Sequence, residues 1–178
     1  MAGDRSGDRS GGRSGGRSGD RSETHEGGAR RWSYDVQAAT TVGIDDLWPL
    51  VGEARRWKDW AGFTSARLLE EGSPEPDGVG ALRRFAIGPG GSEERVLAWE
   101  PPGHLAYTIE RGYPVRKYRS DVELTPRQDG GTAIRWRGTF DTKVPGTGRV
   151  MQAVTRAMMA AFARRLVRYA ERTATRPR

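Results

Sequence analysis

The chain has 178 residues, enough for one domain with a sizeable core, and its composition excludes several kinds of site. It contains no cysteine, which excludes disulfides, thiolate metal sites and cysteine nucleophiles. Its two histidines, His25 and His104, are too far apart in the sequence for a histidine-based metal site, and nucleotide-binding glycine loops are absent. We therefore expect no metal and no cofactor. No apolar run reaches the length of a membrane span and no secretory signal is evident, so a cytoplasmic location is expected.

The net charge of +7 is concentrated near the C-terminus. Residues 147–178 carry eight arginines against Glu171 alone, whereas residues 32–146 carry 15 basic and 17 acidic side chains. A sheet that binds nucleic acid would need basic strands. The distribution therefore argues against nucleic acid as a partner of the central region.

Residues 1–31 are a low-complexity segment in which Gly-Asp-Arg-Ser and Gly-Gly-Arg-Ser recur with a period of four. A repeat without apolar residues cannot bury surface. We expect this segment and the short basic end at 173–178 to be disordered, with one folded domain at 32–172 between them.

The folded region begins with a predicted strand at 32–42, where Tyr34 and Val36 alternate with Asp35 and Gln37. Two short helices are predicted next, in DDLWPLVG and in EARRWKDWAGF. Six further strands are predicted at 64–70, 79–87, 93–99, 104–110, 116–125 and 132–142. The segments between these strands are rich in Gly and Pro, and such short connections favour an antiparallel meander.

The last three strands alternate clearly enough to assign one apolar face to each. That face carries Leu105, Tyr107, Ile109, Tyr118, Ser120, Val122, Leu124, Ile134, Trp136, Gly138 and Phe140. Arg135 and Arg137 lie on the opposite face of the final strand. The sheet should therefore be covered on one side only.

The cover is a long helix predicted at 147–172, about 40 Å in length. Its apolar positions recur at steps of three or four and are Met151, Val154, Met158, Phe162, Leu166 and Tyr169. The fold class is therefore α+β, a seven-stranded antiparallel sheet with one long C-terminal helix.

Several short motifs follow one another along the chain: Asp46–Leu50, Trp57 with Trp60, Gly78–Phe85, Arg95–Pro102, Leu105–Tyr107, and Thr125-Pro126 before Gly130–Thr132. Together they resemble the motifs of the START-like (SRPBCC) helix-grip superfamily, in its polyketide cyclase/dehydrase and lipid-transport group. The resemblance covers residues 34–172 and implies the order β-α-α-β-β-β-β-β-β-α, with the sheet wrapped around the last helix. It makes the region 32–172 a START-like ligand-binding domain.

Strand parity and the resemblance together imply a cavity between the concave sheet face and the long helix. The residues expected to line it are Phe85, Trp99, Tyr107, Tyr118, Trp136, Phe140, Met151, Met158 and Phe162. Such a lining suits a planar hydrophobic ligand, which Trp136 should sense by its fluorescence. For any one of these residues taken alone a core position is the better interpretation, whereas the set as a whole favours a cavity.

Arg83 is the polar candidate of most interest. If Phe85 points inward, Arg83 does too, and a buried arginine needs an anionic partner or ligand. It could hold a ligand carboxylate or an enolate, or it could pair with a surface acid at the strand edge. Ser120, Tyr107 and Tyr118 could anchor a ligand hydroxyl or carbonyl. No acid–base pair is evident, so no catalytic residue is assigned.

Three functions remain open. The first is a carrier or sensor of a hydrophobic, planar or lipid-like small molecule, and the second is an aromatic polyketide cyclase/dehydrase-type enzyme. The third is association with a membrane or nucleic acid through the basic helix and the tail, with Arg164, Arg165 and Arg168 as the contacts to an anionic membrane. The first is favoured because the expected lining is apolar and no acid–base pair is visible.

Overall fold

The computed structural model describes residues 31–175. The predicted tail, apart from Arg31, lies outside the described residues, as do residues 176–178. The elements are β1 (Trp32–Thr40), α1 (Ile44–Gly52), a 3₁₀ turn (Ala54–Arg56), α2 (Trp57–Trp60), β2 (Ser65–Glu70), β3 (Leu82–Ile87), β4 (Gly90–Glu100), β5 (His104–Arg111), β6 (Val115–Pro126), β7 (Thr132–Thr142) and α3 (Gly148–Ala174). The predicted order and the α+β class are confirmed.

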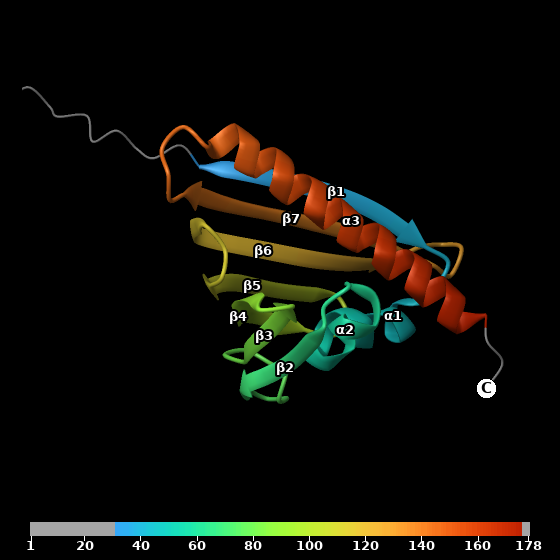
Figure 1. The fold of residues 1–178 in the computed structure, drawn as a ribbon. Coiled ribbons are helices and arrows are strands. Elements are labelled where there is room, and N and C mark those ends of the chain that lie inside the picture. The colour runs from blue at the N-terminus through green and yellow to red at the C-terminus, as the bar shows by residue number, and fades with distance from the viewer. Residues whose placement is uncertain (1–30, 176–178) are drawn as a thin grey trace, which may run out of the picture.

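All seven strands form one antiparallel sheet in the order β1-β7-β6-β5-β4-β3-β2. The meander runs from β2 to β7, and β1 then pairs with β7, opposing Tyr34 to Gly138 and Val36 to Trp136. The long helix α3 lies across β1 and β7, while α1 and α2 cover the sheet near the C-terminal end of α3 (Figure 1). This arrangement is the helix-grip fold that the sequence predicted.

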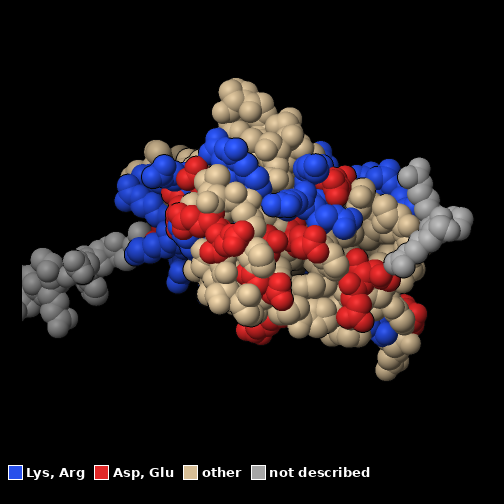
Figure 2. Space-filling view, turned by 90° about the horizontal axis from the view of Figure 1, so that it is seen from below, with Lys and Arg blue, Asp and Glu red and all other residues tan. Residues whose placement is uncertain are grey.

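The two faces of the sheet differ as the alternation predicted. On β7, Ile134, Trp136 and Phe140 are buried against the interior. The other face carries cross-strand ion pairs, such as Arg135 Nη2 to Asp35 Oδ2 at 2.6 Å. The side of the molecule in Figure 2 likewise shows basic and acidic side chains interspersed rather than one basic surface.

The buried face of α3 differs from the prediction by about one position over its first half. Val154 is 51% exposed, and Met158 is only partly buried. The buried stripe passes instead through Thr155 and Met159, and then through Phe162, Ala163, Leu166 and Ala170. Thr155 can be buried because its hydroxyl bonds the Tyr113 hydroxyl at 2.7 Å, a partner that apolar periodicity does not reveal.

Three element boundaries also differ from the prediction. The helix α3 continues to Ala174, so residues 173 and 174, expected in the disordered end, are helical. Strand β3 begins at Leu82 rather than at Val79, which forms an isolated bridge with Ser73. Strand β4 begins at Gly90 because its glycines pair with Ile87 and Ala86 in a tight hairpin.

Candidate ligand-binding cavity

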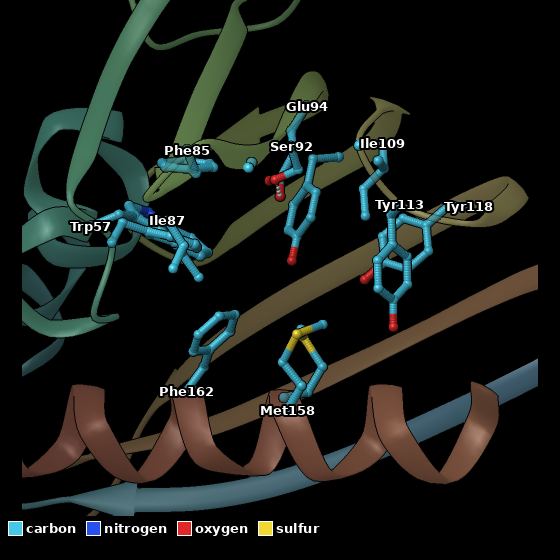
Figure 3. A pocket seen from close by; sticks show the side chains of 16 residues that line it. Trp57, Phe85, Ile87, Ser92, Glu94, Ile109, Tyr113, Tyr118, Met158 and Phe162 are labelled. Atoms are coloured by element: carbon cyan, nitrogen blue, oxygen red, sulfur yellow. Dashed lines mark hydrogen bonds between the residues drawn. The ribbon is translucent and has the colours of Figure 1, made fainter. Parts of the chain in front are cut away.

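A cavity of about 230 Å³ lies between the sheet and the middle of α3 (Figure 3). Its walls come from the helices and from four strands. They are formed by Trp57, Phe63, Phe85, Ser92, Glu94, Tyr107, Ile109, Tyr113, Tyr118, Met158, Met159 and Phe162. The remaining lining residues, Ile87, Gly90, Gly91 and Gly112, are exposed and mark the open side.

The rim of this opening depends on close backbone approach. Gly112 has a φ of +85°, and a Cβ atom built on it would lie 1.9 Å from the carbonyl oxygen of Gly91. A side chain at residue 112 is therefore excluded both by conformation and by space. The β5–β6 connection can consequently lie directly against β4 and bring Tyr113 to the cavity.

Trp57 forms the centre of the aromatic wall. Its indole stacks on Phe85 at 5.0 Å between ring centroids and meets Phe162 edge-on at 6.4 Å. Its Nε1 donates a 2.8 Å hydrogen bond to the carbonyl of Val51 in α1. The polar edge of the indole is therefore satisfied within the protein, and its rings are held in place beside the hollow.

Arg83 and Glu94 form a buried ion pair beside the cavity. Arg83 is 0% and Glu94 7% exposed, and Arg83 Nη2 donates to Glu94 Oε2 at 3.3 Å. The guanidinium carbon lies 5.1 Å from the ring centroid of Tyr107 and 5.4 Å from those of Trp57 and Phe85. Arg83 Nε and Nη1 have no hydrogen-bond partner in the described part of the chain. The surrounding aromatic faces offer these donors a weaker, quadrupolar stabilisation.

Burial affects the protonation of Glu94. It raises the pKa of Glu94, and the charge of Arg83 opposes that rise. Ser92 Oγ donates a further bond to Glu94 Oε1 at 3.3 Å. Arg83, proposed as the residue that meets the ligand, does not line the cavity, whereas Glu94, its partner, does. The acid that pairs with Arg83, expected at the surface, is therefore the buried Glu94.

A second polar cluster, the tyrosine network, consists of Tyr34, Tyr107, Tyr118, Ser120 and Trp136. Tyr34 donates to Ser120 Oγ at 2.8 Å and shares a 2.6 Å bond with the Tyr118 hydroxyl. Trp136 Nε1 donates to Ser120 Oγ at 2.9 Å and to the Tyr107 hydroxyl at 3.2 Å. Burial raises the pKa of Tyr34, Tyr107 and Tyr118 above the usual value. These phenols therefore remain neutral at physiological pH and are poor candidates for a base.

The structure places five of the eleven predicted site residues on the cavity wall: Phe85, Tyr107, Tyr118, Met158 and Phe162. The other six lie elsewhere. Arg83 sits behind the aromatic wall, and Ser120, Trp136 and Phe140 are buried in the core beside it. Met151 packs against the core without lining the cavity. Trp99 packs edge-on against Trp48 of α1 at 5.1 Å. Strand parity identifies the inward face, but the helices fill most of that face and leave a hollow over only part of it.

Sequence reasoning missed Glu94 because it stands in the charged run Glu93-Glu94-Arg95, which is typical of an exposed strand. A signal was nevertheless present. The β3–β4 hairpin register opposes Arg83 to Glu94, so an inward arginine on β3 specifies an inward acid on β4. Trp57 and Met159 were missed because only the tertiary structure shows which turns of α2 and α3 face the hollow. Phe63 was missed because it lies in the connection between α2 and β2, which has no periodic pattern.

The basic side chains of α3 are exposed and partly engaged with the protein. Arg165 Nη1 donates to the Ala61 carbonyl at 2.7 Å, and Arg168 Nε donates to the Arg164 carbonyl at 3.3 Å. Within residues 31–175, no three His, Asp or Glu side chains gather so as to hold a metal ion. In the same part of the chain, no helix is long and apolar enough to cross a membrane.

Comparison with solved structures finds the same fold in several bacterial proteins. A START superfamily protein from Mycobacterium smegmatis has a TM-score of 0.69 and 11% identity over 80% of this chain and 99% of its own. The protein XoxI from Bacillus cereus has a TM-score of 0.67 and 14% identity over 82% and 99%, respectively. A protein from Thermobifida fusca has a TM-score of 0.62 and 24% identity over 77% and 94%. At such identities the likeness shows the fold alone.

None of the curated proteins compared with the sequence is similar enough to count as a relative. A family model described as polyketide cyclase / dehydrase and lipid transport, in contrast, matches residues 31–171, nearly the whole described region. The element order, the sheet topology and the cavity beneath the terminal helix agree with that match. The chain therefore belongs to the polyketide cyclase / dehydrase and lipid-transport family.

Proposed function

We propose that this domain binds a flat, apolar small molecule in the cavity and acts as its carrier or sensor. The observation that carries the proposal is the lining: aromatic rings surround an open hollow, and Phe162 and the thioether of Met158 close it on the side of α3 (Figure 3). Aromatic faces favour a planar partner, and methionine adapts to its outline.

The size of the cavity narrows the ligand class. A volume of about 230 Å³ lies below the ~300–1,000 Å³ typical of pockets for drug-sized ligands. The cavity therefore suits a molecule of about two fused rings. A longer chain would have to extend through the opening beside Ile87, whose side chain is 59% exposed.

Most polar groups on the wall are already satisfied by the protein. The Tyr113 hydroxyl bonds Thr155 at 2.7 Å, and the Tyr118 hydroxyl bonds Tyr34 at 2.6 Å. Water in the cavity consequently finds few partners, and its displacement by an apolar ligand is favourable.

A second candidate function is a cyclase/dehydrase-type reaction, and one observation favours it. Glu94 is a carboxyl group on the cavity wall whose pKa is raised by burial, as a group that exchanges a proton with an enolisable ketone requires. In that case Glu94→Gln should abolish turnover of such a ketone without abolishing the binding of an apolar probe. Membrane contact through Arg164, Arg165 and Arg168 and a cytoplasmic location stay predictions from the sequence.

The binding proposal is tested by titration with 2-methoxynaphthalene, a neutral two-ring probe, monitored by tryptophan fluorescence. Trp57 lines the cavity and Trp136 does not, so Trp57 replaces Trp136 as the expected reporter. The signal should disappear in Trp57→Phe and persist in Trp48→Phe, a matched change within α1 at a residue that does not line the cavity. Calorimetry on the same variants separates loss of signal from loss of binding.

A blocking variant completes the test. Met158→Trp should fill the hollow and weaken binding at least tenfold while the melting temperature is retained. Absence of binding to the wild type below about 100 μM, near −5.5 kcal/mol, would contradict the proposal.

A further inference from the structure

We propose that Glu94 makes the cavity selective for neutral ligands that carry a hydroxyl donor, such as hydroxyarenes, over carboxylates and over the corresponding ethers. This inference rests on the proposed binding function and specifies its ligand class. It reverses the sequence-based expectation that an inward arginine would attract a ligand carboxylate.

The first step is the hydrogen-bond capacity of the wall. A carboxylate has about four lone-pair sites. Glu94 uses two of them, for Arg83 Nη2 and Ser92 Oγ, and both contacts are long at 3.3 Å. Glu94 lies on the cavity wall with Ser92 beside it, across the hollow from Met158 (Figure 3). It therefore has acceptor capacity left for a ligand donor.

The second step is the competition from other wall groups. The hydroxyls of Tyr113 and Tyr118 are engaged with Thr155 and Tyr34. The Tyr107 hydroxyl already accepts from Trp136 Nε1. A ligand hydroxyl consequently finds its strongest acceptor in Glu94, because a bond to an ionised acceptor is about twice as strong as a neutral one.

The third step is charge. Arg83 and Glu94 compensate each other, but only Glu94 lines the cavity, so an anionic ligand meets a carboxylate, and none of the described lining residues is a lysine or arginine. The phenols packed around the pair, Tyr107 and Tyr118, stay neutral because burial raises their pKa values. An ammonium ligand would add an uncompensated charge to the same buried region. A neutral hydroxyl adds none.

The test uses three probes with one ring system: 2-naphthol, 2-methoxynaphthalene and 2-naphthoate, titrated at pH 7 by calorimetry. We expect 2-naphthol to bind at least about tenfold more tightly than 2-methoxynaphthalene, the gain of one charge-assisted hydrogen bond. Binding of 2-naphthoate should be the weakest of the three.

Variants assign the selectivity to Glu94. Glu94→Gln should reduce the preference for 2-naphthol, but it leaves Arg83 buried and unpaired and so endangers folding. The double variant Arg83→Met with Glu94→Leu removes both charges together and should keep the fold. In it the preference should vanish, so that 2-naphthol and 2-methoxynaphthalene bind with affinities within about threefold of each other. The matched control Glu93→Gln changes the neighbouring acid, which pairs with Arg84 at 2.9 Å, and should leave the preference intact.

The outcomes separate this inference from the binding proposal. If 2-methoxynaphthalene binds but 2-naphthol has no advantage, or keeps it in the double variant, the role of Glu94 is refuted and the binding function stands. Tighter binding of 2-naphthoate would show that Arg83 reaches the ligand and would also refute it. If none of the three probes binds the wild type, the binding function and the inference fail together.

Discussion

Two polar clusters share the inner side of this sheet, and they differ in how completely their hydrogen bonds are made. In the tyrosine network, Ser120 Oγ receives bonds from Tyr34 and Trp136, and the Tyr34 hydroxyl also bonds Tyr118. In the second cluster, Arg83 makes one long bond to Glu94 and leaves Nε and Nη1 without a partner among the described residues.

The difference in hydrogen bonding corresponds to the surroundings of each cluster. The tyrosine network links β1, β5, β6 and β7, and all its members are buried. Tyr107 and Tyr118 border the hollow with their rings, but the hydroxyls of the network bond one another. A satisfied buried network fixes the relative positions of the strands that contribute to it. The Arg83–Glu94 pair reaches the hollow through Glu94 alone, and its partial set of bonds leaves room for a ligand group. The closed cluster thus stabilises the fold, and the open one is suited to recognition.

Substitution of Phe162, which contacts both the cavity and the tyrosine network, should cause the largest loss of stability. Phe162 lines the cavity and packs against Trp136 of the tyrosine network at 6.1 Å between centroids. Phe162→Ala should cost about 3–5 kcal/mol in the free energy of unfolding, measured by urea denaturation. A loss below about 1 kcal/mol would place the ring outside the packed interior and contradict the gripping face of α3.

The tyrosine network should make the protein sensitive to alkali. Its three tyrosines have folded-state pKa values raised above the ordinary value of 10. Unfolded tyrosines lose protons above pH 10 while the folded ones keep theirs, so stability is full below pH 10 and falls as the pH rises. Between pH 10 and 11 each tyrosine should contribute a loss of about 1 kcal/mol, or about 3 kcal/mol for the three, and the slope approaches about 1.4 kcal/mol per tyrosine per pH unit at higher pH.

Urea unfolding at pH 9, 10 and 11 measures this loss, and phenolate absorbance reports ionisation. Tyr107→Phe should reduce the slope by about a third. Ionisation of these tyrosines near pH 10 in the folded protein would contradict the proposed burial.

Two serines give a direct contrast between the clusters. Ser120→Ala leaves Trp136 Nε1 with only the longer bond to Tyr107 and removes the acceptor of Tyr34, so it should cost about 2–3 kcal/mol. Ser92→Ala removes one 3.3 Å bond beside the hollow and should cost less than about 1 kcal/mol. Equal losses by chemical denaturation would remove the distinction between a closed and an open cluster.

Deletion of residues 1–28 should have the smallest effect. The repeats in that segment contain no apolar side chain and therefore add nothing to either cluster. The melting temperature of the truncated protein should stay within about 4 °C of the full chain, roughly 1 kcal/mol. A larger fall would show that the tail packs on the domain.

The sequence by itself determined the elements and their class. Alternation along β6 and β7 identified the buried side, because the side-chain period of a strand is two and burial selects apolar residues. Short Gly- and Pro-rich connections identified the antiparallel order, because a connection of only a few residues can join only adjacent antiparallel strands. These patterns depend only on residues that are close in sequence, so they can be recognised without knowledge of the fold.

Only the tertiary structure decided which part of the inner face is hollow. Trp136 and Phe85 share the apolar character that predicts a lining residue, yet Phe85 borders the cavity and Trp136 is enclosed by core. The tertiary structure also determined which residues of α3 are buried. Thr155 can be buried because its hydroxyl forms a hydrogen bond with that of Tyr113, which is distant in sequence. Likewise, Arg83 faces inward as parity predicts, but whether it or Glu94 meets a ligand depends on side-chain reach across two paired strands. Such distances arise when strands and helix pack, and no local pattern encodes them.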